Sequence, residues 1–220
     1  MAYEINFTLK TTVPNFSEIE IIHPSAECFL FDMDGTLIDT EKYHAEAIVK
    51  TIQELENNFD YSKCGITKRF LGMPDNTVFE TLKIEDGLFR NISFDEFVES
   101  KNKSLVLTLK EESLHGVVAK GIVELLQELK SKNKKIGLVT ASEKSITEVS
   151  LEQSGLLPFF EIIVTRNDSE KSKPHADPYL LGMNLLGANP SQTIVFEDSF
   201  NGMSAAHCAR VSGIIKASWF

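Results

Sequence analysis

Cys28-Phe-Leu-Phe-Asp32-Met-Asp34-Gly-Thr-Leu-Ile-Asp-Thr40 is an apolar run that leads directly into two alternate carboxylates and a glycine. Consecutive apolar residues without polar alternation are typical of a strand that is buried on both faces. Asp32 and Asp34 stand just beyond that strand, and Gly35 allows the chain to turn there. Because open α/β sheets bind ligands beyond the carboxyl ends of their strands, this stretch predicts a buried parallel strand with a site at its end.

Four further apolar segments alternate with segments of helical spacing. The additional strands are expected at 136–139, 162–164, 193–196 and 212–215. The helices are expected at 122–129, 144–154, 177–186 and 201–210. Strands that alternate with helices in this way predict an α/β fold, built on a Rossmann-like, doubly wound parallel sheet.

The region from Glu41 to Val117 breaks this alternation, because its apolar residues recur at helical spacing. We expect an inserted α-helical cap domain over residues 41–117. The core domain is then formed by residues 1–40 and 118–220. The first 27 residues alternate loosely between apolar and polar positions, which predicts one or two edge strands.

The composition argues against several classes of protein. Apolar residues at 42% and charged residues at 25% are typical of a soluble globular chain. We expect a cytoplasmic protein, because no apolar run approaches the roughly 20 residues of a membrane span and no secretory signal is evident. A net charge of −10 disfavours nucleic acid and membrane surfaces as partners. Three widely spaced cysteines predict buried thiols rather than disulfides or a zinc site.

Motifs at four places along the chain resemble those of the haloacid dehalogenase superfamily. They occur in the family's order, each directly after an expected strand or, for the lysine, before a proline. The motif residues are Asp32 and Asp34, then Thr140, then Lys173, then Glu197 with Asp198. The likeness is to the β-phosphoglucomutase and phosphoglycolate phosphatase subgroup, whose members carry an inserted helical cap.

The resemblance implies a chemical role for each acidic residue. Asp32 would be the nucleophile that forms an aspartyl phosphate, because a covalent intermediate divides one hard hydrolysis into two displacements. Asp34 would protonate the leaving oxygen and later deprotonate the attacking water. Mg²⁺ would be held by Asp32, the backbone carbonyl of Asp34 and Asp198, with Glu197 contributing directly or through water. Such a cation is needed because neighbouring carboxylates and a phosphate repel one another.

The same resemblance implies a clamp for the phosphoryl group. Lys173 would hold both the nucleophile and a phosphoryl oxygen, while the Thr140 hydroxyl and nearby backbone amides would donate to the other oxygens. Further substrate contacts are expected from Gly35, His44, Ala141 and Ser142. His44 matches a cap-hinge histidine of β-phosphoglucomutase, although a helix-surface histidine would fit equally well. Residues 68–73 resemble a glycine-containing turn that reaches over the active site, or form a basic helix end.

These features predict a Mg²⁺-dependent phosphatase for a small phosphorylated metabolite, monomeric or weakly dimeric. A dehalogenase is disfavoured because it normally lacks the second aspartate, Asp34. A phosphonatase would need a cap lysine for a Schiff base, and Lys68 is the candidate. The remaining alternatives are a β-phosphoglucomutase-like phosphomutase and a regulatory protein that binds phosphate without turnover.

Two places depart from the family pattern. Lys120-Gly121 replaces the usual proline and glycine before the helix that follows the cap. Relatives also continue past the fifth strand with another strand and helix, which finish the edge of the sheet. We therefore expect the N-terminal extension to cover that edge, with dimer contacts as the alternative.

Overall fold

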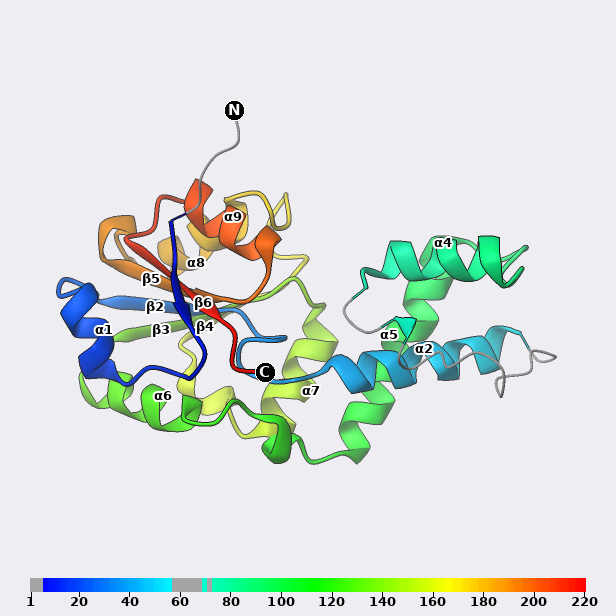
Figure 1. The fold of residues 1–220 in the computed structure, drawn as a ribbon, viewed down its shortest axis with the longest axis horizontal. Coiled ribbons are helices and arrows are strands. Elements are labelled where there is room, and N and C mark those ends of the chain that lie inside the picture. The colour runs from blue at the N-terminus through cyan, green and yellow to red at the C-terminus, as the bar shows by residue number, and fades with distance from the viewer. Residues whose placement is uncertain (1–5, 57–68, 71–72) are drawn as a thin grey trace. The chain divides into compact units, whose positions relative to one another are not determined.

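The computed structural model describes residues 6–56, 69–70 and 73–220 (Figure 1). The chain divides into two compact units. The core unit comprises Met1–Asp39 and Leu114–Phe220, and the helical unit comprises Thr40–Ser113. Residues 114–117, which were expected in the cap, form the short 3-10 helix η2 (Leu114–Val117) and belong to the core unit.

The core unit is built on a six-stranded parallel sheet, which confirms the predicted fold class. In spatial order the strands are β1 (Thr8–Lys10), β6 (Gly213–Ala217), β5 (Thr193–Glu197), β2 (Cys28–Phe31), β3 (Lys135–Val139) and β4 (Ile162–Val164). In the register of the sheet, Phe31 lies beside both Leu138 and Phe196. The residues that follow β2, β3 and β5 therefore emerge together at the carboxyl edge.

Helices cover both faces of this sheet (Figure 1). The core helices are α1 (Phe16–Ile22), α6 (Ile122–Ser131), α7 (Lys144–Ser154), α8 (Asp177–Leu185) and α9 (Phe200–Cys208), with the short 3-10 helices η3 (Leu157–Phe159) and η4 (Pro190–Gln192). Leu30 packs in a buried cluster with Tyr179 of α8 and Met203 of α9. Its neighbour Phe29 contacts Phe16 of α1, with ring centroids 6.3 Å apart. Successive residues of β2 thus pack against helices on opposite faces of the sheet.

The N-terminal segment completes the sheet as expected. β1 pairs in parallel with β6, with Thr8 beside Ile215 and Lys10 beside Ala217. The possible second strand was wrong, because residues 16–22 form helix α1. The Asn15 side chain accepts a hydrogen bond from the Glu18 backbone amide and caps this helix. A local cap therefore outweighs the loose apolar alternation of the sequence.

The helical unit contains α2 (Glu41–Leu55), α4 (Asp75–Glu85) and α5 (Phe94–Glu111) among its described residues. A capping box formed by Ser93 and Glu96 begins α5. The core of the helical unit is aromatic. The ring centroid of Phe97 lies 5.4 Å from that of Phe79 and 5.3 Å from that of Phe89. No helix in the described part of the chain is long and apolar enough to cross a membrane.

The aromatic cluster generates a stability prediction. Phe97→Ala should lower the free energy of unfolding by about 3–5 kcal/mol, because it removes a fully buried ring from between two others. Leu107→Ala, on the same helix but 54% exposed, is the control and should change that free energy by less than about 0.5 kcal/mol. Urea denaturation followed by circular dichroism measures both, and equal effects would contradict this view of the core.

Candidate active site

Four of the predicted motif residues meet at the carboxyl edge of the sheet. Asp32 follows β2, Thr140 follows β3, Glu197 ends β5, and Lys173 comes from the segment between β4 and α8. The Lys173 ammonium lies 2.6 Å from Asp32 Oδ1, 2.5 Å from Glu197 Oε1 and 2.8 Å from the Val139 carbonyl oxygen. One side chain therefore joins three neighbouring strands of the sheet.

Lys173 keeps its positive charge in this setting. Burial alone would lower the pKa of its ammonium, but the carboxylates of Asp32 and Glu197 more than offset that effect and raise the pKa above its usual value. Only 4% of the Lys173 side chain is exposed, so water screens these interactions weakly. The site thus holds a fixed cation beside the nucleophile candidate.

Three carboxylates lie close together in the site. Asp32, Glu197 and Asp198 each offer an oxygen, and these oxygens lie within 4.8 Å of one another. Burial and the charge of Glu197 raise the pKa of Asp32 well above its ordinary value, and they raise the pKa of Asp198 to about 6. Both shifts reflect burial first and, beyond it, neighbouring negative charge that Lys173 does not fully balance. A hard divalent cation with oxygen ligands fits this donor set.

Glu197 is fully buried, and protein donors reach both of its oxygens. Oε1 accepts hydrogen bonds from Lys173 and from the Tyr179 hydroxyl, the latter at 2.8 Å. Oε2 accepts from the Ser199 backbone amide at 3.2 Å and from the Ser199 hydroxyl at 3.0 Å. Burial and Glu197 raise the pKa of Tyr179, so its hydroxyl stays protonated and donates. Because both oxygens already accept hydrogen bonds, these contacts favour a role for Glu197 through water rather than as a direct metal ligand.

Asp34 is oriented by the loop that follows β3. The Ser142 hydroxyl donates to Asp34 Oδ2 at 2.6 Å, and the Ser142 backbone amide donates to Thr140 Oγ1 at 3.0 Å. Ser142 was expected to contact substrate, whereas here its hydroxyl holds the acid–base candidate. Ala141 is exposed at the turn of this loop. Because the Thr140 hydroxyl oxygen accepts the hydrogen bond from the Ser142 amide, its hydrogen can still be donated to another acceptor.

Two glycines make room for the carboxylates. Gly35 has a φ of +77°, and a Cβ at that position would lie 2.4 Å from Asp198 Oδ2. A Cβ at Gly202, in the first turn of α9, would lie 1.7 Å from Glu197 Oε1. Sequence reasoning selected Gly35 but missed Gly202 and Tyr179. A signal existed for Gly202, since a glycine within a helix costs about 1 kcal/mol and so indicates close packing.

The remaining expected residues fall in the helical unit. His44 lies in α2, and its part in the site stays a prediction. Within the expected turn at 68–73, Lys68 and residues 71–72 lie outside the described residues. Arg69 forms ion pairs with Glu85 and, at 2.7 Å, with Asp86. The expectation that this turn reaches over the active site and the Schiff-base role of Lys68 both stay predictions.

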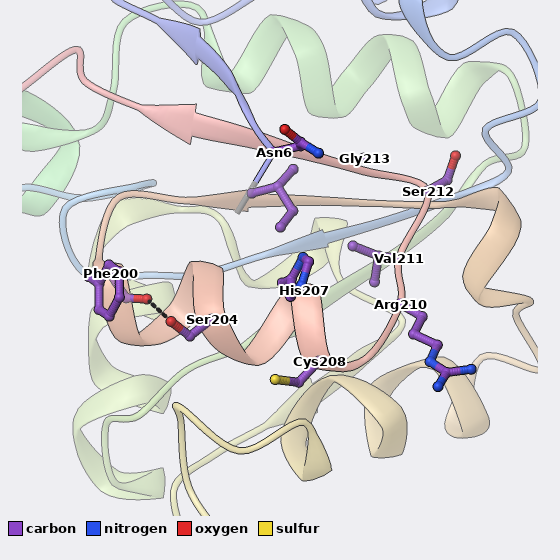
Figure 2. Close-up of a pocket in the computed structure, with 10 residues that line it drawn as sticks. Asn6, Phe200, Ser204, His207, Cys208, Arg210, Val211, Ser212 and Gly213 are labelled. Atoms are coloured by element: carbon purple, nitrogen blue, oxygen red, sulfur yellow. Dashed lines mark hydrogen bonds between the residues drawn. The ribbon is translucent and has the colours of Figure 1, made fainter. Parts of the chain in front are cut away.

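A separate cavity of about 1000 Å³ lies along α9 and the start of β6 (Figure 2). Its lining includes Phe200, His207, Arg210 and Asn6, but not Asp32, Thr140, Lys173 or Glu197. Cys208 also lines it and is exposed, which corrects the expectation that this thiol is buried. Cys28, by contrast, is buried in the sheet.

The family model described as haloacid dehalogenase-like hydrolase matches residues 29–215, and the chain belongs to this family of enzymes. It is 29% identical to a phosphorylated carbohydrates phosphatase of Thermotoga maritima over 86% of this chain and 85% of that protein. It is 27% identical to the pyrophosphatase PpaX of Oceanobacillus iheyensis, over 85% of this chain and 81% of that one. A β-phosphoglucomutase from Clostridium difficile is similar in structure, with a TM-score of 0.66, 25% identity and coverage of 88% and 92%.

The close approach of Gly202 to the Glu197 carboxylate yields a second prediction. Gly202→Ala should lower the free energy of unfolding by about 1–3 kcal/mol, because the added methyl overlaps the buried Glu197 carboxylate. Gly116→Ala is the matched control, since a Cβ there meets nothing within 4 Å. Thermal or urea unfolding compares the two variants. A Gly202→Ala protein as stable as the control would show that the carboxylate is not confined.

Proposed function

We propose that this chain is a Mg²⁺-dependent phosphatase that hydrolyses a small phosphorylated metabolite through an aspartyl phosphate on Asp32. The observation that carries the proposal is the Lys173 ammonium, held between Asp32 and Glu197, with the Asp198 carboxylate in the same cluster. This arrangement supplies a buried nucleophile, a fixed cation and a set of oxygen ligands at one edge of the sheet. The family relationship supports the same chemistry.

In the first displacement, an Asp32 carboxylate oxygen attacks phosphorus while the bond from phosphorus to the leaving oxygen breaks. Lys173 fixes the orientation of Asp32 through its contact with Oδ1. Asp34, held by Ser142, donates a proton to the leaving oxygen, so the product departs as a neutral alcohol. Negative charge that develops on the phosphoryl oxygens is offset by Lys173 and by the Thr140 hydroxyl.

In the second displacement, water attacks the phosphorus of the aspartyl phosphate. Asp34, now a carboxylate, takes the proton of that water, and the bond between phosphorus and Asp32 breaks to release inorganic phosphate. Asp34 is thereby restored to its acid form and Asp32 to its carboxylate form. The hydrogen bond from Ser142 fixes the orientation of the Asp34 carboxyl group. That orientation serves both steps, because the carboxyl group must face the leaving group in the first step and the water in the second.

Asp32, Asp198 and the backbone carbonyl of Asp34 would hold the metal ion, with Glu197 acting through water. When bound, the ion would neutralise carboxylate crowding and draw charge from the phosphoryl oxygens. The raised pKa of Asp198 supports this assignment, because burial and the charge of Glu197 make its anionic form unfavourable without a neighbouring cation. A pair of unit charges 4 Å apart repels by about 4 kcal/mol at an effective dielectric near 20, so a cation has a large effect here.

The proposed substrate is a sugar phosphate or a similar phosphomonoester, which the name of the Thermotoga maritima relative favours. A phosphomutase is the second candidate, favoured by the likeness to β-phosphoglucomutase and by the position of His44 in the sequence. The two differ in product: a phosphatase releases inorganic phosphate, and a mutase returns an isomerised sugar phosphate. Cytoplasmic residence and a monomeric or weakly dimeric state complete the proposal.

Asp32→Asn tests the nucleophile. The variant should lose at least about 10³-fold in kcat, since the amide cannot form the phosphorylated intermediate. A panel of phosphorylated metabolites with Mg²⁺ or with chelator, read by phosphate release and by chromatography of the sugar phosphates, identifies the reaction. Asp95→Asn, an exposed aspartate of α5, is the control and should keep wild-type turnover. Turnover that survives in Asp32→Asn would refute the mechanism.

Metal binding is tested without turnover. Mg²⁺ should raise the melting temperature of the wild-type protein, because an ion that binds only the folded state stabilises it by mass action. Asp198→Asn should remove most of that Mg²⁺-dependent rise by taking away a proposed ligand, while Asp95→Asn should leave it intact. Differential scanning fluorimetry over a Mg²⁺ series gives the midpoints. An equal response of Asp198→Asn and wild type would exclude Asp198 as a ligand.

A further inference from the structure

Trp219 is the single tryptophan of the chain, and it contacts the loop that carries the catalytic aspartates. Its indole Nε1 donates a hydrogen bond to the backbone carbonyl of Thr36 at 2.9 Å. Thr36 is fully buried and lies two residues after Asp34. The contact joins positions 183 residues apart in the sequence, so the segment after β6 touches the loop after β2.

Thr36 also contacts the proposed metal ligand Asp198. Its hydroxyl donates to Asp198 Oδ1 at 3.4 Å, and a Cβ at the preceding Gly35 would overlap the same carboxylate. The loop is closed by hydrogen bonds from the Gly35 amide to the Ile38 carbonyl and from the Thr36 amide to the Met33 carbonyl. A displacement of Thr36 would therefore move the hydroxyl that donates to Asp198. It would also change the space that Gly35 leaves for the Asp198 carboxylate.

Trp219 is itself fixed by the edge of the sheet. The backbone amide of Ser218 donates to the Lys10 carbonyl at 3.0 Å, continuing the pairing of β6 with β1. The N-terminal strand thus holds the residue directly before Trp219. A continuous series of contacts runs from β1 through Ser218 and Trp219 to Thr36, and from there to Asp198.

We propose that Trp219 is a positioning residue for the metal site, acting through Thr36 on Asp198. This inference rests on the proposed function. The indole nitrogen can only donate a hydrogen bond, and the Thr36 carbonyl needs a donor because its residue is fully buried. Without that donor, the loop relaxes toward another partner for the carbonyl, and Asp198 no longer has its oxygens where a metal ion needs them.

Trp219→Phe keeps an aromatic ring and removes only the donor and part of the ring system. The Mg²⁺ concentration for half-maximal stabilisation should rise about three- to tenfold, as expected for loss of one hydrogen bond of ordinary strength. The kcat at subsaturating Mg²⁺ should fall by a similar factor and recover at high Mg²⁺. Phe220→Ala is the matched control, because this neighbouring aromatic residue is 52% exposed and should leave the Mg²⁺ midpoint unchanged.

A double-mutant cycle separates positioning from packing. Thr36→Val removes the hydroxyl that contacts Asp198 but keeps the backbone carbonyl, and it should raise the Mg²⁺ midpoint by itself. If Trp219 acts through Thr36, adding Trp219→Phe to Thr36→Val should raise the midpoint by clearly less than the product of the two single effects. Multiplicative effects would show that the tryptophan acts by another route and would overturn the proposal.

Because Trp219 is the single tryptophan, wild-type fluorescence provides an independent measurement. Emission should change as Mg²⁺ is added, with the midpoint found by thermal stabilisation, and Asp198→Asn should abolish the change. A Mg²⁺ midpoint of Trp219→Phe within twofold of wild type would refute the inference even if Asp32→Asn is inactive. Turnover in Asp32→Asn would instead refute the proposed function, so the two failures are distinguishable.

Discussion

The site depends on one buried cation shared by two buried carboxylates. Asp32 and Glu197 lie at the ends of adjacent strands, and neither could remain ionised there without a counter-charge. Lys173 supplies that charge and also binds the Val139 carbonyl of the third strand. The arrangement leaves a negative excess at Asp198, which would favour a further cation at this edge of the sheet.

Much of the fold could be predicted because its strands are buried on both faces. The apolar runs at Cys28–Phe31, Ile162–Val164 and the other strand positions left few alternative structures. The N-terminal residues were harder. Phe16 and Ile19 are buried in a short helix whose cap is Asn15, and a short segment with both kinds of periodicity does not distinguish a helix from a strand.

That Asp32, Thr140 and Glu197 lie near one another was predictable for a different reason: they stand at the ends of strands whose register brings those ends together. What sequence could not provide is the set of contacts that hold these residues. Tyr179 and Gly202 face Glu197 from α8 and α9, and their role depends on how those helices pack. The resemblance implied a substrate contact for Ser142, which stays a prediction, and the structure adds that its hydroxyl contacts Asp34. Such contacts depend on side-chain direction, which spacing alone does not determine.

Lys173 also explains how a long connection becomes part of the site. It lies between Val164 and Asp177, in a segment with no helix or strand of its own. Two hydrogen bonds hold the start of that segment. The Thr165 amide donates to Asp168 Oδ2 at 2.7 Å, and the Arg166 amide donates to the Ser142 carbonyl at 3.0 Å. Near its other end, the Lys173 ammonium supplies the contact with the sheet. Ordering of this connection therefore accompanies neutralisation of Asp32 and Glu197, because buried carboxylates are strongly destabilising without a counter-charge.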